Sequence, residues 1–129
     1  MVGSKVGEAC VLLPLANRTH GIPEFCKDAE YEETYDSTYN VAFYTKFNKQ
    51  PTFAFSYDNK QSLRYKLCSL KANYTTLHYG IAVFDLDVDD WDNKCGFGNY
   101  SRLRFVKDLL NYFRFGFFSP GDISGCLKL

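Results

Sequence analysis

The spacing of apolar side chains changes near residue 58. Before it, the segments 41–47 and 52–57 are rich in β-branched and aromatic residues, which predicts two short strands. The residues between them, Asn48-Lys49-Gln50-Pro51, predict the turn of a hairpin. The tyrosine- and threonine-rich segment 25–40 favours short extended pieces, and glycines and prolines make residues 1–24 irregular.

After residue 58 the apolar period alternates between helix and strand. Leucines recur at helical spacing through 63–70, and Asp58 can cap this helix at its N-terminus. Residues 79–86 are apolar and β-prone on both faces, which is typical of a strand buried in a parallel sheet. Apolar positions along 103–113 predict a second helix that Gly116 can end. This order of elements predicts an α/β fold, followed by a tail, 117–129, without a clear period.

Length and composition set limits on the kind of protein. The 129 residues make one domain or part of one, and an apolar fraction of 46% excludes a disordered chain. Fifteen basic and fifteen acidic residues cancel, which argues against a nucleic-acid partner. No apolar run approaches about 18 residues, so the sequence predicts no membrane span.

Five cysteines without a Cys-x-x-Cys pair indicate disulfides rather than a zinc site. Three N-glycosylation sequons, at Asn17, Asn73 and Asn99, also indicate an oxidising compartment. We therefore expect a secreted or extracellular glycoprotein. The N-terminus makes a poor signal peptide, which suggests a chain cut from a longer protein or an incomplete gene model.

Two further patterns hold no recognisable chemistry. The acidic run from Asp85 to Asp92 lacks the Gly and Glu of a calcium loop, with Asp90 and Gly96 at those positions. We expect its short carboxylates to accept backbone N–H groups and to cap the following turn. The two histidines lack a nucleophile partner, and the sequence implies no cofactor and no metal.

Three segments carry a family resemblance. They are Pro23-Glu24-Phe25-Cys26, Phe55-Ser56-Tyr57-Asp58-Asn59, and the run from Gly80-Ile81-Ala82-Val83-Phe84 to Asp89-Asp90-Trp91. In order and spacing they resemble a Tyr-Glu-Ile-Cys strand and the seventh and eighth barrel strands of the family 18 glycoside hydrolases, the chitinases and chitinase-like lectins. The resemblance covers about two-thirds of the chain. It implies that 25–116 is the C-terminal βαβα portion of a TIM (β/α)8 barrel, preceded by a small α+β insertion hairpin.

The resemblance also implies specific roles for residues. The family pairs the cysteines that correspond to Cys26 and Cys95. Phe84 stands where the family has the tryptophan under the bound sugar, Ala82 stands where it often has methionine, and Tyr57 ends the seventh strand. These three residues are the expected substrate-binding side chains for chitin or an N-acetylglucosamine oligosaccharide. From the sequence alone, an aromatic residue in such a strand is more often a core residue.

The catalytic Asp-x-x-Asp-x-Asp-x-Glu motif of the family is absent. The resemblance therefore implies a chitinase-like fragment that binds sugar without cutting it. Two alternatives remain open: the C-terminal fragment of an active chitinase, and a small secreted, disulfide-stapled module that binds a protein. A slice of a barrel exposes strand edges, so we expect it to repack, to associate with another chain or itself, or to fold poorly alone.

Overall fold

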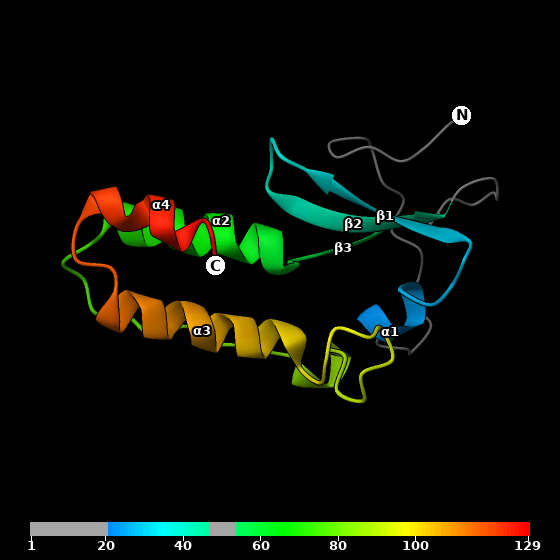
Figure 1. Cartoon of the computed structure of the whole chain (residues 1–129). Coiled ribbons are helices and arrows are strands. Elements are labelled where there is room, and N and C mark those ends of the chain that lie inside the picture. The colour runs from blue at the N-terminus through cyan, green and yellow to red at the C-terminus, as the bar shows by residue number, and fades with distance from the viewer. Residues whose placement is uncertain (1–20, 47–53) are drawn as a thin grey trace.

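The computed structural model describes residues 21–46 and 54–129 (Figure 1). The elements in chain order are α1 (Ile22–Phe25), β1 (Tyr31–Asp36), β2 (Val41–Lys46), β3 (Ala54–Tyr57), α2 (Lys60–Asn73), the 3-10 turn η1 (Leu86–Val88), α3 (Ser101–Phe115), the 3-10 turn η2 (Pro120–Asp122) and α4 (Ile123–Cys126). The three strands lie at one end of a layer formed by α2, α3 and α4.

The sheet is antiparallel throughout, in the order β1-β2-β3. Pairing of Ala42 with Tyr57 confirms the strands of the predicted hairpin, whose predicted turn, 48–51, lies outside the described residues. The extended structure expected within 25–40 is confirmed by β1, whose Glu33 lies opposite Tyr44. This register places the side chains of Glu33, Tyr44 and Tyr57 on one face of the sheet, because side chains two residues apart share a face.

An aromatic stack covers this face of the sheet. The ring of Phe25, from α1, stacks on Phe55 with centroids 4.4 Å apart. Tyr44 stacks on Tyr57 at 5.5 Å, and Phe55 lies 5.8 Å from Tyr57. Aromatic pairs at such distances add stability beyond the area that they bury. The stack therefore fixes α1 on the sheet.

Both predicted helices are confirmed, with one difference at a cap. The side chain of Asn59, rather than that of Asp58, accepts the N–H of Ser62 and caps α2. Asp58 instead accepts the hydroxyl of Ser62 and pairs with Lys66. Gly116 ends α3 as expected, and its N–H bonds to the carbonyl of Tyr112.

The helices share a separate core. Its buried members come from α2, α3, α4 and the segment between α3 and α4: Cys68, Phe105, Leu109, Phe117 and Cys126. Half-buried residues of the same elements, among them Leu63, Leu67 and Ile123, pack around them. Residues 117–129, which carry no sequence period, thus complete the helical core.

The predicted barrel fragment is wrong. The sheet is small and antiparallel, whereas a TIM barrel fragment needs parallel strands joined through helices. Residues 79–86 form no strand: within the described residues β3 pairs with β2 alone, and Tyr79 packs against Phe113 of α3 instead. Residues 23–26, expected in a strand, belong to the short helix α1 and its C-cap. Local β propensity does not make a strand without a neighbour to bond.

Two disulfides join distant parts of the chain. Cys26 is bonded to Cys95, the pair that the resemblance implied, and Cys68 is bonded to Cys126. Two such bonds fit an oxidising, extracellular setting. Among the described residues, no helix is both long and apolar enough to cross a bilayer.

We expect the double variant Cys68→Ser/Cys126→Ser to lose about 4 kcal/mol of unfolding free energy, the loop-entropy contribution of a cross-link between residues 58 positions apart. Urea unfolding followed by circular dichroism measures this loss. Cys10→Ser is the control, since it leaves both described disulfides intact. An unchanged urea midpoint in the double variant would show that the bond between α2 and α4 does not stabilise the helical core.

Candidate functional site

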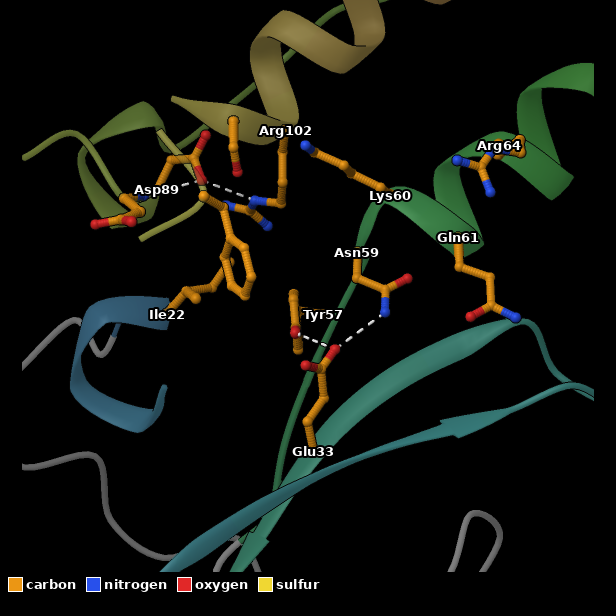
Figure 2. A pocket seen from close by; sticks show the side chains of 12 residues that line it. Ile22, Glu33, Tyr57, Asn59, Lys60, Gln61, Arg64, Asp89 and Arg102 are labelled. Carbon is orange, nitrogen blue, oxygen red and sulfur yellow. Dashed lines mark hydrogen bonds and ion pairs between the residues drawn. The ribbon is translucent and has the colours of Figure 1, made fainter. Parts of the chain in front are cut away.

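A cavity of about 320 Å³ lies where the sheet, the first turns of α2 and α3 and the loop after η1 meet (Figure 2). Twelve residues line it: Ile22, Glu33, Tyr57, Asn59, Lys60, Gln61, Arg64, Asp89, Asp90, Phe97, Ser101 and Arg102. They come from five separate parts of the chain, so the cavity exists only in the folded protein.

The carboxylate of Glu33 is held in place on the sheet side of the cavity. The Tyr57 hydroxyl donates to its Oε1 atom at 2.6 Å, and the Asn59 amide donates to the same oxygen at 3.0 Å (Figure 2). Among the described residues, the Tyr44 hydroxyl alone reaches Oε2, at a long distance of 3.5 Å. Glu33 is otherwise exposed, so Oε2 retains capacity to accept a hydrogen bond from a ligand.

Tyr57 supports Glu33 rather than offering a free ring. Burial, followed by its hydrogen bond to Glu33, raises the pKa of the Tyr57 phenol far above its ordinary value near 10. The phenol is therefore a permanent donor at neutral pH. Tyr44 stacks on the ring at 5.5 Å, and the Arg102 guanidinium lies 6.0 Å from its centroid, so little of the ring remains for stacking on a sugar.

The opposite wall is an acidic loop fixed by its own carboxylates. Arg102 donates from Nε to Asp89 Oδ1 at 2.9 Å, as Figure 2 shows. Asp90 is 2% exposed and accepts the N–H groups of Lys94 and Cys95 at 2.7 and 2.9 Å. The structural role expected for the acidic run is confirmed at Asp90, which holds the loop that carries Cys95.

The α2 side of the cavity carries groups that are free to meet a ligand. Lys60 and Gln61 are exposed, and no hydrogen bond or ion pair engages their side chains within ranges 21–46 and 54–129. Arg64 donates from Nη2 to the Leu129 carbonyl at 2.8 Å. Phe97, at 60% exposure, contributes an open aromatic surface. No motif marks any of these residues or Glu33 in the sequence, and only the fold brings them together.

The three sugar-binding residues expected from the resemblance do not share one site. Tyr57 lines the cavity, whereas Ala82 and Phe84 line a separate apolar groove of about 200 Å³ beside α2 and α3. The Asp89–Arg102 pair borders both hollows and separates them. Phe84 is 81% exposed and belongs to no strand. It therefore provides no floor beneath a sugar held next to Tyr57.

Two of the three predicted glycosylation sites lie on the surface of the described structure. Asn73 and Asn99 are exposed, although the Asn99 amide donates to the Trp91 carbonyl at 2.6 Å. Asn17 lies outside the described residues. Within the part of the chain that the structure describes, no three His, Cys, Asp or Glu side chains are grouped to hold a metal ion.

Comparisons with protein-family models, curated proteins and solved structures find no match to this chain.

Because the folded-state pKa of Tyr57 is raised, its contribution to stability is complete below pH 10 and is lost as pH rises above the unfolded value. We expect wild type to lose stability more steeply than Tyr57→Phe between pH 10 and 11, by up to about 1.4 kcal/mol per pH unit. Chemical unfolding at several pH values measures this slope. Tyr39→Phe, at an exposed tyrosine, is the control and should keep the wild-type slope. Equal slopes for wild type and Tyr57→Phe would contradict the assignment.

Proposed function

We propose that the chain is a secreted protein that binds a short N-acetylglucosamine-type saccharide in the cavity of Figure 2, without cutting it. The observation that carries the proposal is the combination, in one cavity, of the fixed carboxylate of Glu33, the free polar groups of α2 and the open ring of Phe97. The sequence resemblance to chitinases and chitinase-like lectins supports the same class of ligand.

Each group matches a feature of such a sugar. Glu33 can accept hydrogen bonds from ring hydroxyls, because Tyr57 and Asn59 occupy mainly its other oxygen. Gln61 and Lys60 can donate to the acetamido carbonyl. The ring of Phe97 can pack against the apolar face of the pyranose or the acetamido methyl group.

The size of the cavity limits the ligand. Small-molecule sites usually span about 300–1,000 Å³, and this cavity, at about 320 Å³, lies at the lower end of that range. We therefore expect it to take one or two sugar rings, with the rest of a longer chain in solvent. Two disulfides fit the extracellular setting in which such saccharides occur.

Titration calorimetry with chitotriose tests the proposal. We expect measurable binding, and we expect Phe97→Ala to raise Kd about tenfold by removing the apolar contact, equivalent to about 1.4 kcal/mol. Phe118→Ala is the matched control, because Phe118 is 77% exposed but lies outside the cavity. Heat from chitotriose that is unchanged in Phe97→Ala, or no heat with wild type, would reject this site.

A second experiment addresses cleavage. Since the sequence lacks the family's proton-donating glutamate motif, we expect no release of fluorophore from a fluorogenic chitobioside by this chain. Turnover that persists in pure protein and is abolished by Glu33→Gln would contradict this expectation, because Glu33 is the exposed carboxylate fixed within the cavity.

A further inference from the structure

An apolar segment of the chain has no backbone partner. Between Leu77 and Asp85 the chain forms no helix, strand, turn or bend. Among the described residues, no hydrogen bond reaches a backbone N–H or C=O of residues 79–84, Tyr-Gly-Ile-Ala-Val-Phe. A stretch of apolar residues with unpaired backbone groups can act as a template for a further strand.

The first residues of this segment are fixed against the helices, and the residues that follow are exposed. The Tyr79 ring packs edge-on against Phe113 of α3 at 6.4 Å, and Ile81 is half-buried. Ala82 and Phe84 are exposed, and no atom beyond the neighbouring residues lies within 4 Å of the position that a Cβ of Gly80 would take. The segment is therefore held in place at Tyr79, while Ala82 and Phe84 remain exposed and its backbone groups remain unpaired among the described residues.

We infer that a second copy of the chain pairs with residues 79–84 as an antiparallel strand about a two-fold axis. The two paired strands would form a two-stranded ribbon with the two-fold axis perpendicular to it. Residues that lie opposite each other across this ribbon have their side chains on the same face. Centred on Ala82, this register sets Gly80 opposite Phe84 of the second copy, and Ile81 opposite Val83. The exposed Phe84 ring then covers the empty space above Gly80, and the small Ala82 side chains meet at the axis.

Charge complementarity also favours a second copy of the chain as the partner of this segment. Lys71 is buried, bonds to the carbonyls of Thr75 and Leu77, and lies with its Nζ 5.7 Å from the Tyr79 ring centre. No carboxylate pairs with it in the described parts of the chain, and the Tyr79 hydroxyl also lacks a partner. In this register Asp85 of the second copy lies opposite Tyr79. It brings a carboxylate toward a buried ammonium twice in each dimer.

Sedimentation velocity of the 129-residue chain tests the pairing. We expect a monomer–dimer equilibrium with the dimer populated at about 100 µM, the level of a weak interface. Phe84→Lys places a cation opposite Gly80 and should weaken association at least about tenfold. Phe118→Lys is the matched control, because Phe118 is similarly exposed but outside the segment, and it should associate like wild type. Circular dichroism checks that both variants are folded.

A cross-linking experiment tests the register. In a Cys10→Ser background, which removes the cysteine outside both disulfides, Ala82→Cys should form a symmetric disulfide-linked dimer on mild oxidation. Opposed residues in antiparallel strands lie about 4.5–5.5 Å apart at Cα, within disulfide reach. Asp87→Cys, at an exposed position beyond the segment, should not cross-link efficiently.

The inference is overturned by a chain that remains monomeric at this concentration. It is equally overturned by a dimer that Phe84→Lys leaves intact, by open-ended oligomers in place of a closed dimer, or by cross-linking at Asp87→Cys that equals that at Ala82→Cys. A saccharide titration gives an independent result, since the cavity and this segment lie on different sides of the Asp89–Arg102 pair.

Discussion

The Cys26–Cys95 cross-link is the constraint on which the arrangement of the cavity depends. It joins the end of α1 to the loop that follows η1, and these two segments are 69 residues apart in the sequence. Residues near each cysteine of this disulfide are also packed or hydrogen-bonded closely. A Cβ on Gly21, at the start of α1, would lie 2.8 Å from the Val88 carbonyl, and the Asp90 carboxylate holds the N–H of Cys95. Among the described residues, this bond is the disulfide that ties the loop carrying Asp89 and Phe97 to the end of α1.

The rest of the molecule consists of two packed units that meet at the cavity. Phe25 and the aromatic stack fix α1 on the sheet, whereas the second disulfide and the buried residues around Leu109 hold the helices together. The cavity takes its acceptor, Glu33, from the sheet and its free donors, Lys60 and Gln61, from α2. The geometry of the cavity therefore depends on the relative placement of these units, to which Asn59 contributes by capping α2 and donating to Glu33 of the sheet.

Patterns confined to one element could be predicted from the sequence, and those that depend on tertiary pairing could not. The periodicity of 63–70 and 103–113 predicted the two long helices, and Leu63, Leu67 and Phe113 of these stripes pack against the helical core. The strand predicted at 79–86 is absent, because an apolar, β-prone sequence favours extended structure locally but does not supply a neighbouring strand to pair with. Phe84 consequently lies exposed and outside any strand, whereas the cysteine pair implied by the resemblance is present. The sequence around Glu33, Gln61 and Phe97 contains no motif that marks them as site residues, because only the folded structure brings them together.

We propose above that an N-acetylated sugar binds in a cavity whose acidic wall is tied to α1 by the Cys26–Cys95 bond. Amide chemical-shift mapping during a chitotriose titration tests it most directly. The account predicts that shifts concentrate at Glu33, at residues 59–61 and at Phe97, and that they disappear in Cys26→Ser/Cys95→Ser while persisting in Cys68→Ser/Cys126→Ser. Shifts confined to residues 81–86, or shifts that survive loss of the first disulfide, would contradict it.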